Sequence, residues 1–463
     1  MVSAGHPQLM GPTEAISRFV AETRFDALPG PVVEAAKIAI LDGIGCLLAG
    51  SAGPLARIVA DYVRGLGGNP QCVVAGHGFR TNPVMAAFAN GTFLHALDFE
   101  IQGIPPAHGT SAILPPALAL GEVFGASGKD VIVAYAVGWE VQQRLRAASA
   151  RFRGRMFHPP GVFGPLGAAA SAAKILGLEA GQVRMALGIA ASRTGGLFAN
   201  NGTMVKSTHP GNAARMGVEA ALLAAAGFVS NDAILEAHQG YVETFFGQDF
   251  EWDQLTRNLG LSWNLVDPGF YIKRFPAEIY MQWVAEAVLD LRAAHGLRPE
   301  DVDELEVELP ALRPELSRPR PKSGLEGKFS FEYCAAVALA TGRVDIDAFT
   351  DGVRFSPEVE AALDKVRLRP HPDVPMDTAH MFARATARLK DGRRVTAECR
   401  HFRGSPENPM SPAERLGKFR ACAGRVLDPA EWDRLTDMVE NLERVADIRR
   451  LTAALEGAGR ADP

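Results

Sequence analysis

The sequence has few cysteines, and its first residues lack the pattern of a secretory signal. Only five Cys occur in 463 residues, their number is odd, and no two form a CxxC pair, which argues against a disulfide framework and a structural zinc site. Residues 1–12 hold no basic stretch followed by an apolar one, so we expect no signal peptide. These absences favour a reduced, cytoplasmic protein.

An excess of positive charge and a long apolar helix are absent as well. The net charge is -5, with 47% hydrophobic and 22% charged residues, an ordinary globular composition that argues against a nucleic-acid-binding face. Residues 101–121 carry no formal charge, but the prolines within them would break a membrane-spanning helix. We therefore expect neither nucleic acid nor a membrane as a partner.

Several widespread catalytic and nucleotide-binding motifs are missing. No GxSxG nucleophile elbow occurs. Residues 324–330 resemble a phosphate-binding loop only superficially, because the spacing of their Gly, Lys and Ser is wrong. Residues 211–217 are not a dinucleotide fingerprint, since no strand pattern precedes them. The sequence therefore gives no sign of a serine hydrolase, a P-loop protein or a Rossmann-type dehydrogenase.

An imidazole and a carboxylate stand at the edge of the uncharged stretch. Asp98 precedes it, and His108 is the titratable side chain within it. Histidine titrates near neutrality, and a carboxylate partner fixes its tautomer and raises its basicity. The pair predicts proton-transfer chemistry, although two polar residues hydrogen-bonded in a core would give the same pattern.

Four loops rich in Gly and Pro carry titratable side chains beside helices of small residues. They cover residues 98–108, 157–161, 201–211 and 272–276. Because function concentrates in loops and three of these loops carry a cation, we expect them to meet at one site for an anion, although solvated loops with incidental charges are the alternative.

Lys206 and His209 precede a helix that we expect to begin near Pro210, a residue tolerated in a first turn. The positive end of that helix would strengthen their attraction for a carboxylate. His95 and Asp98 could supply two metal ligands from one helix face, but no third ligand stands at helical spacing, so we expect no metal.

The spacing of apolar residues divides the chain into helical and mixed parts. Residues 12 to about 265 show helical spacing. Beyond Pro268, residues 302–309 alternate as a strand, and residues 382–389 and 394–400 flank an Asp-Gly pair typical of a hairpin. Helices are expected at 277–295 and 331–340 between these strands, and again from 412 to about 455.

These patterns predict a mainly α protein with a discontinuous large domain. A large all-helical domain would be built from both chain ends, residues 1–267 and 405–463, with a smaller α+β lid domain inserted at 268–404. Pro268 and Gly269 mark the exit from the helical part, so the hinge should lie near residues 273–276.

The chain resembles the MmgE/PrpD family, which includes 2-methylcitrate dehydratase, cis-aconitate decarboxylase and an iminodisuccinate epimerase. No single motif is decisive, but their order and spacing together are specific. The segments that carry the resemblance are 41–46, 90–99, 158–170, 202–214, 273–276, 328–333 and 406–419.

The resemblance implies a homodimer acting on a small carboxylic acid without a metal or organic cofactor. The catalytic residues that it implies are Asp98, His108, His158, Lys206, Lys273 and Tyr333. His108, oriented by Asp98, and His158 would transfer protons, while the lysines and Arg274 would stabilise charge developing beside a substrate carboxylate. Our candidates for binding the substrate are Gln102, His209, Arg274 and Glu278.

Two positions depart from the usual family pattern. Residues 98–102 read Asp-Phe-Glu-Ile-Gln, so that Ile101 replaces a carboxylate and Gln102 a small hydroxyl. Glu278 stands where His or Cys is common, and a carboxylate there would repel a polyanion unless it is protonated or paired with a cation. We therefore expect a lyase whose substrate is neither cis-aconitate nor 2-methylcitrate. It would carry one carboxylate fewer, or an amine or hydroxyl in its place.

Two other functions stay open at this point. An epimerase of a dicarboxylate such as iminodisuccinate would use two bases on one carbon and release nothing. A relative that binds a carboxylate without turnover is the alternative outside enzymes, and Ile101, Gln102 and Glu278 are the residues that point to it.

Overall fold

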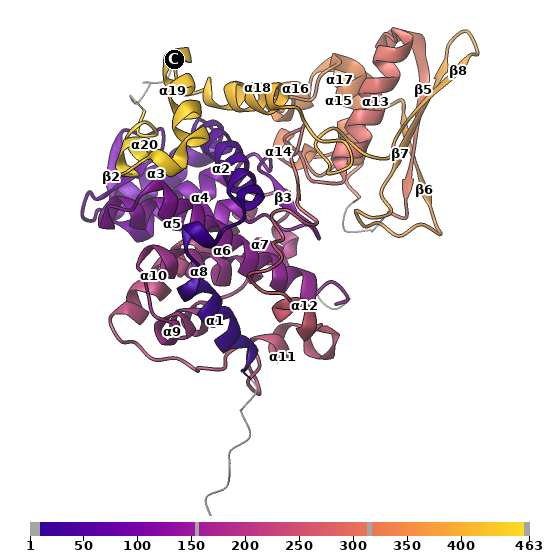
Figure 1. The fold of residues 1–463 in the computed structure, drawn as a ribbon. Coiled ribbons are helices and arrows are strands. Elements are labelled where there is room, and N and C mark those ends of the chain that lie inside the picture. The colour runs from indigo at the N-terminus through magenta and orange to yellow at the C-terminus, as the bar shows by residue number, and fades with distance from the viewer. Residues whose placement is uncertain (1–9, 153–156, 313–316, 458–463) are drawn as a thin grey trace, which may run out of the picture.

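The computed structural model describes residues 10–152, 157–312 and 317–457. Figure 1 shows a large body of packed helices with a smaller unit, built on a four-stranded sheet, to one side. Each has its own hydrophobic core. One core contains residues from Ile16 to Ile272 and from Met410 to Leu455, and the other contains residues from Tyr271 to Phe402. Segments near both ends of the described chain therefore build the helical body.

The helical body begins with a long series of helices. These are α1 (Pro12–Glu22), α2 (Gly30–Ser51), α3 (Pro54–Leu66), α4 (Pro83–His95), α5 (Thr110–Phe124), α6 (Gly128–Ala148), α7 (Pro159–Val162), α8 (Gly164–Ile175), α9 (Ala180–Ala191), α10 (Met204–Ala225), α11 (Tyr241–Phe245) and α12 (Trp252–Thr256). Several start with proline in the first turn, where the missing N–H costs nothing.

Helices α4, α5, α8 and α10 pack against one another in the centre of this body. Gly211 of α10 lies so close to α4 that a Cβ would meet Thr92 Oγ1 at 2.1 Å and the carbonyl oxygen of Phe88 at 2.7 Å. The prediction that this helix begins near Pro210 is wrong, because α10 begins at Met204 and Pro210 lies inside it. The burial of a close-packed face outweighs the hydrogen bond that proline cannot make.

Pro115 and Pro116 also lie inside a helix, α5, instead of ending it. Within the described residues, no helix is both long and apolar enough to cross a membrane.

This first part of the chain is not wholly helical. β1 (Cys72–Val74) pairs antiparallel with β2 (Phe79–Thr81), and β3 (Gln102–Gly103) pairs antiparallel with β4 (Phe270–Tyr271). The prediction of an all-helical domain is wrong in this respect, because strands of two or three residues are too short to show an alternating pattern. The β3–β4 pair brings the segment after Asp98 next to the segment before Lys273.

The smaller unit has a sheet with the strand order β6-β5-β7-β8. Its strands are β5 (Val302–Pro310), β6 (Val366–His371), β7 (Ala383–Leu389) and β8 (Arg394–Cys399). Its helices are α13 (Met281–His295), α14 (Gly324–Gly327), α15 (Phe331–Thr341), α16 (Asp351–Arg354) and α17 (Pro357–Leu363). The predicted β7–β8 hairpin is present, and Leu305, Val307 and Leu309 are buried on one face of β5 as the alternation predicts. β6, parallel to β5, escaped prediction because only its first and third residues, Val366 and Leu368, are strongly apolar.

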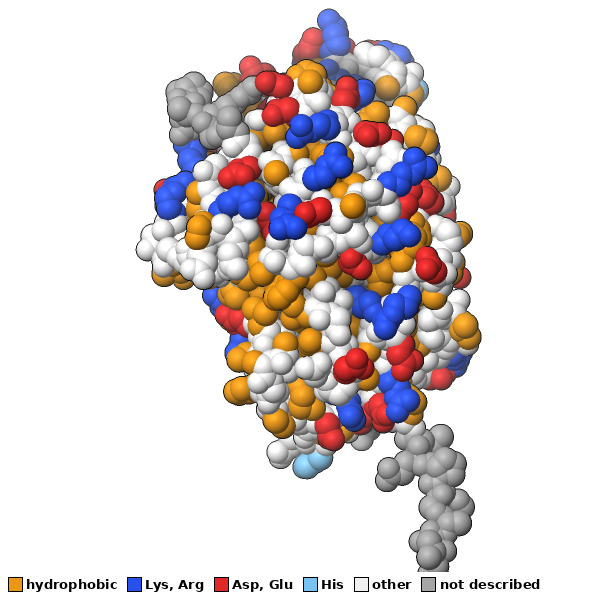
Figure 2. Space-filling model, turned by 60° about the vertical axis from the view of Figure 1, so that its left-hand side comes forward, with side chains coloured by type: hydrophobic (Ala, Val, Ile, Leu, Met, Phe, Trp, Pro, Cys, Tyr) orange, Lys and Arg blue, Asp and Glu red, His pale blue; other side chains and the backbone are white. Residues whose placement is uncertain are grey.

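The chain then returns to the helical body through α18 (Pro412–Ala423), α19 (Pro429–Glu440) and α20 (Arg449–Ala453). Ser411 and Glu414 form a capping box that starts α18. α18 and α19 pack on α2, close to the beginning of the chain (Figure 1). On the face drawn in Figure 2, charges of both signs are interspersed and apolar side chains form a band between them.

Candidate active site

The site is organised around Asp98, just beyond the end of α4. Asp98 has φ 52°, a left-handed conformation that Asp adopts more readily than most residues. Lys206 of α10 and Lys273, which follows β4, both donate to its carboxylate. Lys273 also donates to the carbonyl oxygen of Asp98 at 2.9 Å. One buried carboxylate thus holds two buried ammonium groups.

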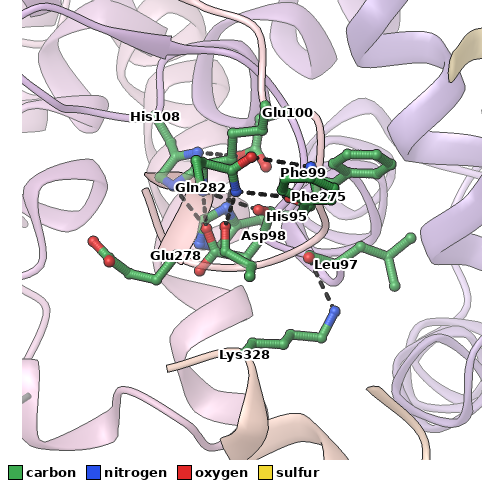
Figure 3. Close-up of polar contacts among 12 residues, drawn as sticks. His95, Leu97, Asp98, Phe99, Glu100, His108, Phe275, Glu278, Gln282 and Lys328 are labelled. Atoms are coloured by element: carbon green, nitrogen blue, oxygen red, sulfur yellow. Dashed lines mark hydrogen bonds and ion pairs between the residues drawn. The ribbon is translucent and has the colours of Figure 1, made fainter. Parts of the chain in front are cut away.

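His108 lies between two carboxylates (Figure 3). Its Nε2 is 3.1 Å from Asp98 Oδ1, and its Nδ1 is 3.0 Å from Glu100 Oε1. Glu100 Oε1 also accepts a hydrogen bond from Ser111 Oγ at 2.9 Å and lies 2.6 Å from His95 Nδ1. The imidazole therefore has a carboxylate on each side, which fixes where it can deliver a proton.

The loop that carries these residues is braced from the far end of the chain. Lys418 of α18 donates to the carbonyl oxygen of Phe99 at 2.8 Å and pairs with Asp42 of α2 at 2.6 Å. Asp42 accepts from the backbone N–H of Ile101 at 3.0 Å. The packing of α18 on α2 therefore holds the loop of residues 98–102 in place.

The segment with Lys273 is fixed by groups of the smaller unit. Gln282 of α13 accepts from the backbone N–H of Phe275 at 3.0 Å and donates to its carbonyl oxygen at 2.9 Å (Figure 3). Lys328, next to α14, donates to the carbonyl oxygen of Leu97 at 2.9 Å. Both parts of the molecule thus contribute to the surroundings of Asp98.

His158 reaches the site from the start of α7. Its backbone N–H donates to the carbonyl oxygen of Gly196 at 3.0 Å. A Cβ on Gly161 would meet the carbonyl oxygen of Gly195 at 1.9 Å, so only glycine allows these two loops to meet. The Nδ1 atoms of His158 and His209 lie 3.0 Å apart, which requires one of them to donate to an unprotonated partner.

The two central carboxyl groups are ionised. Burial alone would raise the pKa of Asp98, but the ammonium groups of Lys206 and Lys273 hold it well below the usual range. Burial likewise opposes ionisation of Glu100, and its contacts with His108 and His95 nevertheless hold its pKa well below normal.

The pKa values of the surrounding histidines and of Lys328 are lowered, which favours their neutral forms. Burial, reinforced by Lys206, lowers the pKa of His209 to about 4 and that of His158 well below its usual value. Burial also lowers the pKa of His95 to about 4, against the attraction of Glu100. Burial lowers the pKa of Lys328 to about 7, against Asp98. The site therefore combines neutral imidazoles with buried ion pairs.

We expect these histidines to make the free energy of unfolding fall steeply in acid. Their pKa values are lower in the folded chain than in the unfolded one, so the unfolded state binds more protons as the pH falls from about 6.5 towards 4. Each of the three can lower the free energy of unfolding by at most about 1.4 kcal/mol per pH unit. Urea unfolding at a series of pH values measures the slope, and His209→Gln should reduce it. An equal slope in that variant would contradict the assignment.

A cavity of about 630 Å³ opens beside this network. Six predicted residues line it: Asp98, Gln102, His108, His158, Lys206 and Glu278. Lys273 lies behind Asp98, and His209 lies behind His158. Burial raises the pKa of Glu278, although Lys273 opposes the shift. The Oε1 atom of Gln102 is buried and has no hydrogen-bond partner among the described residues.

Arg274 and Tyr333 do not line this cavity in the described part of the chain, so their predicted places in the site are corrected. The Arg274 side chain is 42% exposed and pairs with Glu286 at 2.7 Å, because it points away from its buried neighbour Lys273. Tyr333 is buried in the core of the smaller unit, where its hydroxyl donates to the carbonyl oxygen of Ala348 at 2.5 Å. A buried hydroxyl needs such a partner.

Sequence reasoning gave no role to four residues that the fold brings to the site. Glu100 stands two residues after Asp98 and could have been suspected from that spacing. His95, considered only as a metal ligand, lies 3.0 Å from Lys206 Nζ through its Nε2. Lys328 begins segment 328–333 of the family resemblance, which could have suggested it, whereas Arg146, which lines the cavity, had no signal in the sequence that we can identify.

His95, Asp98 and His108 also place potential metal ligands within 4.8 Å of one another. The ammonium groups of Lys206 and Lys273 already occupy the Asp98 carboxylate, and Lys206 faces His95 as well. A divalent cation at this point would face two positive charges, so the donor set fits a lysine-bound carboxylate better than a metal centre.

A buried carboxylate with two lysines, beside imidazoles and a cavity, defines a site suited to proton transfer on an anionic small molecule. Comparison with known proteins now adds the family. The MmgE/PrpD N-terminal domain model matches residues 14–253, and the MmgE/PrpD C-terminal domain model matches residues 275–444. The chain belongs to the MmgE/PrpD family, which confirms the resemblance inferred from the sequence.

Three relatives illustrate the range of this similarity. Cis-aconitate decarboxylase of Homo sapiens is 33% identical over 457 residues, which cover 96% of this chain and 94% of that protein. Cis-aconitate decarboxylase of Aspergillus terreus is 28% identical over 96% of both chains. 2-Methylcitrate dehydratase of Cupriavidus necator is 24% identical over 74% of both chains.

Proposed function

We propose that this protein is a lyase that releases CO₂ or water from a small di- or tricarboxylic acid by moving a proton beside a carboxylate. The observation that carries the proposal is His108, held between Asp98 and Glu100 at the wall of a cavity that His158 also lines. A histidine fixed in this way can exchange a proton with a bound substrate, and such a step is worth about 10²–10⁴-fold in rate.

The cations of the site suit a substrate with carboxylate groups. Lys206 and Arg146 line the cavity, and Lys273 lies directly behind Asp98. Negative charge that builds up on a carboxylate during proton transfer would be stabilised by ammonium groups that are already in place. His158, neutral at pH 7 because its pKa is well below 6.5, could accept a proton.

Decarboxylation is the reaction that we favour. The relatives named cis-aconitate decarboxylase match nearly the whole chain, whereas the dehydratase matches three quarters of it at lower identity. In an acid with a double bond one carbon from the departing carboxylate, the electrons of the breaking C–C bond form a new double bond. The old double bond then takes a proton from the general acid, and CO₂ leaves.

Assays with purified, chelator-treated protein test this function. Cis-aconitate, citrate, 2-methylcitrate, iminodisuccinate and epoxysuccinate form a suitable panel, and we expect release of CO₂ or water from one of these acids or a close analogue. Solvent deuterium entering a substrate without either release would favour the epimerase. A ligand that raises Tm but is never consumed would favour a non-catalytic binder. Loss of activity on chelation, restored by zinc or iron, would overturn the proposed independence from metal.

Gln102 and Glu278 should set the preference among such acids. Both line the cavity, and both offer oxygen acceptors where a polyanion would need donors. We expect the double variant Gln102→Thr, Glu278→His to gain about tenfold or more in kcat/KM on cis-aconitate, the worth of one hydrogen bond to a charged group, and to lose activity on the native substrate. Efficient turnover of cis-aconitate by the native protein would contradict this prediction.

Two further features follow from the resemblance and remain proposals. We propose a homodimer, which light scattering on the purified protein would check. We also propose that residues 268–404 act as a lid that closes over the cavity through the segment at Lys273, expelling water from the site.

A further inference from the structure

The cavity beside His108 has an apolar side that the proposed reaction does not use. Three of its ionisable residues, Asp98, His108 and Lys206, form one connected network. The rest of its wall includes the rings of Phe152, Phe163 and Phe246. Phe163 and Phe246 stack with ring centroids 5.5 Å apart, and Phe152 meets Phe246 edge-on at the same distance. The cavity wall thus includes both charged groups and a cluster of aromatic rings.

The aromatic cluster is built into the fold. Phe163 and Phe246 are buried, 5% and 4% exposed, with their rings held by each other. Phe157 and Leu197 form an antiparallel bridge. Phe157 and Phe198, the residue after Leu197, both line the same cavity. These rings belong to segments that also position His158, so the apolar wall and the catalytic groups share one support.

We propose that the substrate carries an apolar alkyl chain of several carbons, which this wall binds while the carboxylates face Lys206 and Arg146. The inference rests on the proposed function and names the substrate class within it. Phenyl rings offer no hydrogen bond to a carboxylate, so a compact polyanion would leave the half-buried rings of Phe152, Phe157 and Phe198 facing water. A volume of about 630 Å³ lies well within the range of sites that enclose drug-sized ligands, and exceeds what a six-carbon acid fills.

A series of succinates tests the wall without requiring turnover. Succinate, methylsuccinate, butylsuccinate and hexylsuccinate present the same two carboxylates with chains of increasing length. Calorimetric titration of the full-length protein should show affinity rising about fourfold for each buried methylene. Affinity that is constant or falls with chain length would overturn the proposal.

Variants locate the effect in this cavity. Phe198→Ala and Phe157→Ala, at half-buried positions, should each weaken butylsuccinate binding about tenfold more than they weaken succinate binding. The matched control is Phe228→Ala, which alters a phenylalanine 56% exposed near the end of α10 and should change neither affinity. Equal effects of the control and the cavity variants would place alkyl binding elsewhere and end the proposal.

Turnover separates this proposal from the lyase proposal. If no acid is consumed but affinity still rises with chain length, the lyase function fails and the apolar site stands. If unsubstituted acids are consumed with a higher kcat/KM than their alkyl-substituted analogues, the lyase function stands and the apolar site fails. A higher kcat/KM for the alkyl-substituted acid supports both.

Discussion

Replacing His108 by Asn or Gln is expected to lower kcat by about 10²–10⁴-fold with little change in KM. Asn places an amide near Glu100 and Gln places one near Asp98, so each variant keeps a polar group facing one of the two carboxylates that flank the imidazole. Neither amide can accept and return a proton at neutral pH. A stopped assay of product formation with the substrate found in the panel measures the loss.

The control for this pair is His238→Asn. His238 is 82% exposed and pairs with Glu243 at the surface, so its loss should leave kcat within about twofold. Far-ultraviolet circular dichroism and Tm show whether the His108 variants are folded. Folded variants that keep more than a tenth of the native kcat would remove His108 from the proton-transfer step.

Replacing Asp98 by Asn should damage both stability and catalysis. The amide leaves the buried ammonium groups of Lys206 and Lys273 without their countercharge. Breaking a buried ion pair from one side costs about 3–5 kcal/mol, because the remaining charge stays buried and unpaired. The variant also loses the carboxylate that orients His108, so kcat should fall in the protein that remains folded.

Urea unfolding and kcat, measured on the same preparation, test both effects. Asp447→Asn is the control, since Asp447 forms an exposed ion pair with Arg449 and should leave unfolding and kcat unchanged. Adding Lys273→Met to Asp98→Asn should restore part of the stability without restoring activity. An Asp98→Asn protein as stable as the native one would show that the two lysines do not depend on this carboxylate.

The sequence determined most of the regular elements. Helical spacing indicated that residues 12 to about 265 are mainly helical, and period-two alternation with an Asp-Gly turn identified β5, β7 and β8. These patterns are local, because the burial of one face is imposed on residues two, three or four apart. The sequence also supplied Asp98, His108, His158, Lys206 and Lys273, which the fold brings together around one network and its cavity.

Contacts between distant segments bring these side chains together. Lys206 lies 111 residues from His95, and Lys273 lies 175 residues from Asp98. No local pattern records such distances. The fold also places the Arg274 side chain at the surface, where it pairs with Glu286, whereas its neighbour Lys273 is buried. The Tyr333 hydroxyl donates to a backbone carbonyl instead of lining the cavity.

The course of α10 also shows local sequence preference being overridden by packing between helices. Proline predicts a helix start, yet the close approach of Gly211 to α4 carries the helix through Pro210 and places Lys206 within its first turn. Local propensity is worth a few kcal/mol at most, whereas packing sums over every buried contact of the helix. The sequence therefore determined which residues could act, and the packing of distant helices decided which of them share the cavity.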